Sequence, residues 1–147
     1  MSERAAASAG GHRFRLRVYW EDTDAAGIVY YANYLRFIER ARSDFVRRAG
    51  IDQWALLTAE GLSFQVRRCE IDYRKPARLD DELEVETTIQ RLGGASLEMA
   101  QVVRGAGREL VRALVRLACV DGGGQPRRIP GPVRQALRNH AGQETEG

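Results

Sequence analysis

One short stretch near the N-terminus, WEDTDAAGIVYYANYLRF, concentrates residue types that can do chemistry. Asp22 and Asp24 lie between an expected strand and an expected helix, and a glycine and a tyrosine-rich run follow them. Gly27 would let the backbone approach a ligand closely. Amides at the start of the helix, near Tyr31 and Ala32, would point outward with a positive dipole and would suit a developing oxyanion. A carboxylate opposite such amides can attack a polarised carbonyl or direct water at it.

The same acids also have a simpler interpretation. Acidic residues often precede a helix because they interact favourably with its dipole, and the pattern alone favours such a charged turn. The apolar IVYY segment after the acids indicates instead that at least one carboxylate faces a partly buried cleft. For Asp22 we favour a capping or turn role over tuning of Asp24 by like-charge repulsion. Glu39 is expected to form a helical ion pair with Arg36 or Arg42.

Other kinds of site find little support in the sequence. Histidine occurs only as His12 and His140, near the two ends, whereas a Ser-His-Asp or Cys-His site needs a histidine held by the core. The sequence has neither a metal-ligand spacing nor a phosphate-binding glycine loop. Cys69 and Cys119 are expected to be buried thiols in a reducing cytoplasm. We therefore expect no metal and no other cofactor.

The composition indicates one soluble, cytoplasmic domain. With 147 residues, of which 44% are hydrophobic, the chain can bury one core and has no room for a second domain. The formal net charge is +3, and Lys75 is the only lysine among 23 basic residues. Because no apolar run approaches about 20 residues, we expect no membrane insertion. Residues 1–11 should be a disordered lead-in, residues 12–140 the domain and residues 141–147 a disordered tail.

The elements that would position the acids follow from the periodicity of apolar residues. Alternation predicts a strand over FRLRVYW, from Phe14 to Trp20. Helical spacing predicts a long helix over residues 31–50 that ends at Gly50, and Asp52 would cap a short helix after it. The apolar face of the long helix comprises Tyr34, Phe37, Ile38, Ala41, Phe45 and Ala49.

Four further segments are predicted to be consecutive antiparallel strands. They cover residues 62–79, 81–92, 95–105 and 109–122. In the first, the apolar residues change parity, which predicts a bulge near Arg67 and Arg68, and Pro76 should limit its pairing. Residues 130–140 would form a short helix with Pro132 in its first turn. One long helix facing one antiparallel sheet is an α+β arrangement.

Two segments, EDTDAAGIVYYANYLRFIERAR and IDYRKPARLDDELEVET, resemble the hotdog-fold acyl-CoA thioesterases of the 4-hydroxybenzoyl-CoA thioesterase type. Within that group the chain is most similar to the branch associated with the bacterial Tol-Pal envelope system. The similarity covers roughly residues 13–130, and the D-x-D-x-x-G-I-V-Y motif is its specific part. The resemblance implies a hotdog fold, in which a long central helix is wrapped by a five-stranded antiparallel sheet. It also implies dimers that join sheets edge to edge, and often tetramers.

The resemblance implies roles for three residues of the motif. Asp24, the second acid of the D-x-D pair, would be the catalytic carboxylate, and the backbone amide of Tyr31 would polarise the thioester carbonyl. Gly27 would let the thioester approach the backbone. The implied reaction converts an acyl-CoA and water into a carboxylic acid and free CoA, without a metal or redox cofactor. The sequence leaves open whether the carboxylate attacks the thioester or acts as a base on water.

One departure from the family pattern concerns the acyl group. The Tol-Pal branch often has a histidine at the position of Tyr31, so a preference for short aliphatic acyl groups does not carry over, and an aryl or longer group also fits. Arg67, Arg68, Lys75 and Arg78 could pair with the phosphates of coenzyme A. A solvated strand face would show the same arginines, and for each one that interpretation is favoured.

Three alternatives to a thioesterase remain for this sequence. The main one is a non-catalytic hotdog module that binds acyl-CoA, and the intact Asp24 and Gly27 argue against it. A hotdog dehydratase would need an acid–base pair that usually includes a buried histidine. A nucleic-acid binder would show a basic stripe with stacking aromatic residues, which the sequence lacks. The expected partners are therefore acyl-CoA and further copies of the chain, in a dimer or a tetramer.

Overall fold

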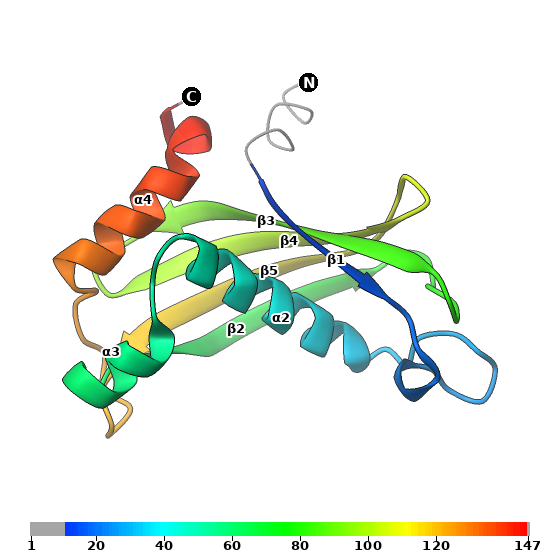
Figure 1. The fold of residues 1–147 in the computed structure, drawn as a ribbon, viewed down its shortest axis with the longest axis horizontal. Helices are drawn as coiled ribbons and strands as arrows, with labels where there is room; N and C mark the ends of the chain where they lie inside the picture. Colours follow the sequence, from blue (N-terminus) through cyan, green and yellow to red (C-terminus); the bar gives the residue numbers. More distant parts are fainter. Residues whose placement is uncertain (1–10, 147) are drawn as a thin grey trace.

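The protein forms one five-stranded antiparallel sheet that curves around a long helix (Figure 1). The computed structural model describes residues 11–146, with the side chains of residues 141–146 excepted. The strand order in the sheet is β1-β3-β4-β5-β2. The elements are β1 (His12–Arg17), the 3₁₀ turn η1 (Trp20–Asp22), α2 (Asn33–Arg48), α3 (Gln53–Glu60), β2 (Ser63–Tyr73), β3 (Glu82–Leu92), β4 (Ser96–Gly105), β5 (Arg108–Val120) and α4 (Gly131–Glu146).

This arrangement confirms the predicted α+β class with a central helix and a five-stranded sheet. The expected limits of the domain stay predictions. Residues 1–10 and 147, together with the side chains of residues 141–146, lie outside the described part of the chain, so the proposed disordered lead-in and tail are not tested.

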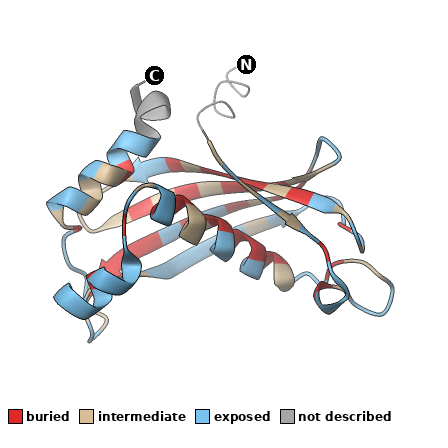
Figure 2. Ribbon diagram, viewed as in Figure 1, coloured by how far each residue is buried: buried red, intermediate tan, exposed pale blue. Residues whose placement is uncertain are grey.

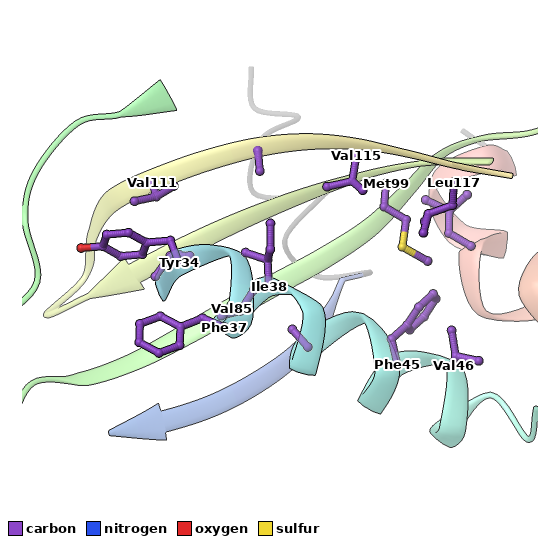
Figure 3. Packing of buried hydrophobic residues seen from close by; sticks show 14 of the residues in the cluster. Tyr34, Phe37, Ile38, Phe45, Val46, Val85, Met99, Val111, Val115 and Leu117 are labelled. Atoms are coloured by element: carbon purple, nitrogen blue, oxygen red, sulfur yellow. The ribbon is translucent and has the colours of Figure 1, made fainter. Parts of the chain in front are cut away.

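The long helix α2 lies across the sheet and turns one apolar face toward it (Figures 1 and 2). The apolar side chains of α2 pack against those on the inner faces of the strands and fill the space between helix and sheet (Figure 3). Burial of one such side chain stabilises a fold by about 1.5–3 kcal/mol. The buried residues of the helix are Tyr34, Phe37, Ile38, Ala41, Phe45 and Val46. The predicted face is thus confirmed, except that Ala49 is only half-buried and Val46 takes part.

Strand β2 contains the predicted bulge, between Val66 and Arg68. Because of this bulge, its apolar residues all pair with inward-facing residues of β5 although their sequence parity changes. The strand ends at Tyr73, three residues before Pro76, in agreement with the expected limit on pairing. The inward-facing residues of β5 are Val111, Ala113, Val115, Leu117 and Cys119, as predicted, and all are buried.

The first strand is shorter at its C-terminal end than the sequence predicted. Strand β1 ends at Arg17, and Trp20 lies in η1 with 70% of its surface exposed. The alternating pattern was misleading here because the carboxylate of Asp22 accepts a hydrogen bond from the amide of Tyr19 at 2.9 Å, which turns the chain out of the sheet. Trp20 is therefore not a core residue.

Two further expectations about side chains were wrong. Cys69 is exposed, because β2 lies at the edge of the sheet and α2 packs mainly against β3 and β1. Cys119 is buried, as expected. Glu39 accepts a hydrogen bond from the hydroxyl of Ser43 at 2.9 Å, and no ion pair of Glu39 occurs within residues 11–146.

His12 belongs to β1 rather than to a loose end. Its Nε2 lies 2.9 Å from the carboxylate of Asp44 on α2, and its ring packs against that of Phe45, with centroids 5.5 Å apart. Burial lowers the pKa of His12 below its ordinary value of 6.5 and outweighs the opposite influence of Asp44, while Arg48 and His140 lower it further. The folded chain therefore disfavours a protonated His12.

This environment predicts a loss of stability in mild acid. When the pKa of a histidine is lower in the fold than in the unfolded chain, the unfolded chain takes up the proton first, so stability falls as the pH drops through about 6.5. We expect the free energy of unfolding of the natural protein to fall more between about pH 7.5 and about pH 5 than that of His12→Gln. Urea unfolding at both pH values measures the free energy of unfolding of each protein. An equal decrease in the natural protein and in His12→Gln would contradict the lowered pKa of His12.

Candidate functional site

The loop between η1 and α2 is closed at its base by Asp22. The carbonyl oxygen of Asp22 accepts hydrogen bonds from the amide of Tyr30 at 3.0 Å and from the side-chain amide of Asn33 at 2.8 Å. Its carboxylate holds the amide of Tyr19, and the residue is buried. These contacts confirm the favoured turn role of Asp22 and join the two ends of the loop.

The tip of this loop is a tight turn between Asp24 and Ile28. The amide of Asp24 donates to the carbonyl of Ile28 at 2.9 Å, and the amide of Gly27 donates to the carbonyl of Asp24 at 3.0 Å. Gly27 has a φ of 80°, a conformation that strains other residues. A Cβ atom at this position would meet no atom within 4 Å. The backbone conformation requires glycine, and the space beside it is open.

The carboxylate of Asp24 is partly engaged in this turn. Its Oδ1 accepts hydrogen bonds from the amides of Ala26 at 2.8 Å and Ile28 at 3.4 Å. Within the described chain, Oδ2 has no partner, and the residue is exposed. The IVYY segment predicted that at least one carboxylate of this stretch faces a partly buried cleft. The buried acid is Asp22. Asp24 instead presents one oxygen to solvent from a fixed turn.

Two backbone amides at the start of α2 have no acceptor in the part of the chain that the structure describes. The amides of Asn33, Tyr34 and Leu35 each donate to a carbonyl three residues earlier, but those of Tyr31 and Ala32 donate to none. The N-cap residue, Ala32, offers no side-chain acceptor. These are the amides that the sequence predicted to point outward, at the positive end of the helix dipole.

The segment before β3 holds the acidic loop in place. The amide of Val29 donates to the carbonyl of Ala77 at 2.9 Å, and the amide of Leu79 donates to the carbonyl of Gly27 at 2.9 Å. The amide of Ala77 in turn donates to the hydroxyl of the buried Tyr34 at 3.0 Å. The loop is therefore connected to α2 through residues 77–79 as well as through its own ends.

Tyr73, at the end of β2, is a site residue that the sequence analysis missed. Its hydroxyl donates to the carbonyl of Tyr31 at 3.3 Å, and the two rings meet edge to face with centroids 6.0 Å apart. Burial, followed by the influence of Cys69 and Tyr31, raises the pKa of Tyr73, so its hydroxyl keeps the proton it donates. The carbonyl of Tyr31 and the amide of Ala32 belong to one planar peptide unit, whose orientation this bond fixes.

A weak signal for Tyr73 was present in the sequence. After the predicted bulge, Tyr73 shares its parity with Ile71 and therefore belongs to the inner side of the sheet. That parity did not reveal the long-range partner, since Tyr31 lies 42 residues away in the chain. Only the three-dimensional arrangement brings the end of β2 beside the start of α2.

The basic residues considered for phosphate contacts have different surroundings. Arg67 donates to a backbone carbonyl at 3.0 Å, and Arg68 forms an ion pair with Glu70 at 2.8 Å. In the described residues, the side chains of Lys75 and Arg78 form neither an ion pair nor a hydrogen bond. Among residues 11–146, no three His, Cys, Asp or Glu side chains lie close enough to hold a metal ion together.

A curved antiparallel sheet around one long helix, with an acidic loop before that helix, defines a hotdog-fold protein of the thioesterase type. The comparison with protein families agrees: residues 18–137 match the family described as the thioesterase-like superfamily. The chain belongs to this superfamily, and the predicted hotdog fold is confirmed.

Similar proteins carry names of one enzyme class. The chain is 42% identical over 130 residues to the acyl-CoA thioesterase YbgC of Haemophilus influenzae, a match that covers 88% of this chain and 96% of that protein. A probable thioesterase from Bartonella henselae superposes with a TM-score of 0.78 at 43% identity, covering 82% of this chain and 99% of the other. A thioesterase from Thermus thermophilus, solved with coenzyme A and Zn, superposes with a TM-score of 0.78 at 32% identity, covering 90% and 95%.

The helices offer no candidate for a membrane span. Within the described residues, none of them is both long enough and apolar enough to cross a bilayer.

Proposed function

We propose that the protein hydrolyses acyl-CoA thioesters to a carboxylic acid and free CoA. The observation that carries this proposal is the uncapped start of α2, where two amides without an acceptor among residues 11–146 lie in the same loop structure as an exposed carboxylate. Such amides stabilise an oxygen that becomes negative during attack on a carbonyl. The names of the relatives support the same class of reaction.

In the proposed reaction, the thioester carbonyl oxygen accepts a hydrogen bond from the amide of Tyr31, and the open space at Gly27 admits the thioester. Two routes then use the carboxylate of Asp24. In one, it attacks the carbonyl carbon, CoA thiolate leaves, and water hydrolyses the resulting mixed anhydride. In the other, it accepts a proton from water, whose oxygen attacks the carbonyl carbon, and the C–S bond then breaks as CoA thiolate leaves. Both routes consume one water and release one acid and one CoA.

A second candidate is a hotdog module that binds acyl-CoA without hydrolysing it. The hydrogen bonds from Ala26 and Ile28 to the carboxylate of Asp24 favour this candidate, because they give that residue a structural role in its turn. Within the described part of the chain, however, Oδ2 accepts no hydrogen bond, and a structural role for Asp24 does not require the amides of Tyr31 and Ala32 to lack an acceptor there.

Thiol release from a panel of acyl-CoAs separates the two candidates. The panel should contain short, long and aromatic acyl groups, and the signal must be corrected for Cys69, which is exposed. We expect turnover of at least one group. Binding of acyl-CoA without turnover of any member would overturn the proposed reaction and leave the binding module.

Tyr73 is expected to act as a positioning residue: it fixes the peptide unit that carries the amide of Ala32, and this unit adjoins the one that carries the amide of Tyr31. Tyr73→Phe removes the hydrogen bond to the carbonyl of Tyr31 but keeps the ring, so we expect kcat to fall about 10-fold with little change in KM. This is less than the 10²–10³ that loss of an oxyanion donor typically costs. Tyr30→Phe is the matched control, because the hydroxyl of Tyr30 has no partner among residues 11–146 while its ring also packs on Tyr31. A similar kcat for both variants would contradict this role.

We also infer that the protein works as a dimer, or as a tetramer of paired dimers. Strand β2 forms one edge of the sheet, is eleven residues long and is exposed along most of its length (Figure 2). Val66 is 47% exposed and Tyr73 is 45% exposed. A long edge strand with apolar side chains normally requires a cover, and a second copy of β2 would provide one. Light scattering at several concentrations measures the molar mass, and a monomer throughout would exclude this assembly.

The finer assignments rest on the resemblance of the motif and on the relatives. We infer a cytoplasmic protein of the branch associated with the Tol-Pal envelope system. Because Tyr31 stands where that branch often has histidine, a preference for short aliphatic acyl groups does not carry over, and an aryl or longer acyl group also fits. The acyl-CoA panel tests the acyl preference, and detection of the protein in fractionated cells tests its location.

A further inference from the structure

A hollow in the surface close to the acidic loop is lined by three basic side chains. Lys75 and Arg78 come from the segment between β2 and β3, and Arg108 begins β5. The uncharged part of its wall is formed by Pro76, Gly105, Ala106 and Leu110. Residues far apart in sequence thus gather three positive charges around one concave surface.

These three cations lack the partners that most arginines of the sheet have. Neither an ion pair nor a side-chain hydrogen bond is formed by Lys75, Arg78 or Arg108 with any of residues 11–146. In contrast, ion pairs with acids of the same or a neighbouring strand engage several sheet arginines, namely Arg17, Arg68, Arg104, Arg112 and Arg116. Arginines paired with acids are typical of a strand face that is exposed to solvent. The cluster of Lys75, Arg78 and Arg108, which forms no such pairs within residues 11–146, needs another explanation.

Two acids also line the hollow, and both are engaged by other groups. The carboxylate of Asp81 accepts a hydrogen bond from the backbone amide of Arg78 at 2.8 Å. The carboxylate of Glu82 lies 3.7 Å from the guanidinium of Arg17, on the adjacent strand β1. The three basic side chains therefore remain available to an anion from outside the chain.

The hollow is directly connected to the proposed reaction site. Arg78 pairs with Ile28 of the acidic loop in a β-bridge, and the neighbouring amide of Leu79 donates to the carbonyl of Gly27 at 2.9 Å. Figure 1 shows the acidic loop, the segment before β3 and the β4–β5 turn together at one end of the sheet, opposite α3 and α4.

We propose that this hollow binds the phosphate groups of coenzyme A. The inference rests on the proposed function for the identity of its ligand. The pantetheine arm separates the phosphates from the thioester, so an enzyme that holds the thioester at Gly27 needs a second, surface-exposed anion site nearby. The planar guanidinium groups of Arg78 and Arg108 suit bidentate contacts with phosphate oxygens, and Lys75 adds a compact charge.

Binding of free CoA tests the site without requiring turnover. The double variant Lys75→Gln/Arg78→Gln removes two charges with modest changes in size, and calorimetry at low and at moderate salt measures Kd. We expect the variant to bind CoA about 10²-fold to 10⁴-fold more weakly, because it loses two charged hydrogen bonds worth about 1.5–3 kcal/mol each and each 1.4 kcal/mol is tenfold. Its affinity should also depend less on salt.

The matched control is Arg91→Gln/Arg128→Gln, which removes the same charge from the opposite end of the molecule. Arg91 lies near the end of β3, and Arg128 lies close to the turn at Gly94. We expect this control to bind CoA as the natural protein does. If the control lost affinity instead, or if neither variant did, or if the natural protein did not bind CoA at all, the proposed phosphate site would be overturned.

A comparison of two substrates separates this inference from the proposed function. An acyl-CoA and the same acyl group on pantetheine share the thioester but differ in the phosphates. We expect Lys75→Gln/Arg78→Gln to raise KM only for the acyl-CoA and to leave the turnover of the acyl-pantetheine unchanged. If the natural protein hydrolyses both while the variant affects both equally, the phosphate site fails and the thioesterase stands. If neither thioester is hydrolysed but the difference in CoA binding persists, the phosphate site stands and the proposed thioesterase function fails.

Discussion

Asp24→Asn should lower kcat for acyl-CoA hydrolysis by about 10²–10⁴-fold, the range typical for loss of a positioned proton-transfer group. Asparagine has nearly the same shape as aspartate and keeps a carbonyl oxygen that can accept from the amides of Ala26 and Ile28. The turn should therefore persist, while the group can neither accept a proton from water nor attack a thioester. Thiol release gives kcat, and thermal unfolding verifies that the variant is folded.

Asp52→Asn is the matched control for this prediction. Asp52 is likewise an exposed acid in a loop before a helix, and its Oδ1 accepts from the amide of Ala55 at 3.0 Å. A carboxylate that only caps or orders a turn should behave as Asp52 does, with a small change in stability and an unchanged kcat. Retention of full activity by Asp24→Asn would show that its acidic turn has no more than this role.

The time course of a single experiment distinguishes the two chemical routes. If the carboxylate of Asp24 attacks the thioester, CoA leaves before the acid is formed, and slow hydrolysis of the anhydride would give a burst of CoA. If Asp24 acts as a base on water, CoA and the acid appear together. Rapid quenching with separate detection of both products measures the order of release.

Gln101→Leu is expected to lower the free energy of unfolding by about 2–4 kcal/mol, because each stranded buried polar group costs about 1–3 kcal/mol. Gln101 is fully buried in β4, and its amide nitrogen donates to the carbonyl of Ile38 at 2.8 Å and to the hydroxyl of Thr87 at 3.0 Å. Its oxygen accepts from the guanidinium of Arg42 at 3.2 Å. Leucine fills a similar volume but satisfies none of these groups.

Urea unfolding of Gln101→Leu and of Gln90→Leu tests this prediction. Gln90 is an exposed glutamine on the adjacent strand β3, bonded to Thr88 at 3.1 Å, so the same substitution there should change stability by no more than about 0.5 kcal/mol. If both substitutions cost the same, the link between α2 and the sheet through Gln101 would have no special energetic importance.

The features that the sequence predicted well depend on neighbours in the chain. The buried face of α2, the helix cap at Asp52 and the bulge in β2 each follow from the spacing of residues within one element. The acidic loop belongs to the same group, because Asp22, Gly27 and the start of α2 are close in sequence. Local geometry largely determines how such features fold.

The features that escaped prediction depend on partners far along the chain. Cys69 is exposed because β2 is an edge strand, which only the complete strand order reveals. His12 is held by Asp44, and Tyr73 reaches Tyr31, across 32 and 42 residues respectively. Sequence periodicity assigns a side chain to one side of an element, but it does not identify the residue that the side chain will meet.

The bulge in β2 contains the one extra residue of that strand, so the number of residues after it is critical. Side chains alternate along a strand, so deletion of Glu70, which lies beyond the bulge, would turn every later position of β2 to the opposite face. Tyr73 would then point away from Tyr31, and Ile71 would leave the inner face. The exposed turn at residues 122–124 carries no such constraint. Natural insertions and deletions in this family should therefore accumulate in turns of that kind and avoid the middle of β2.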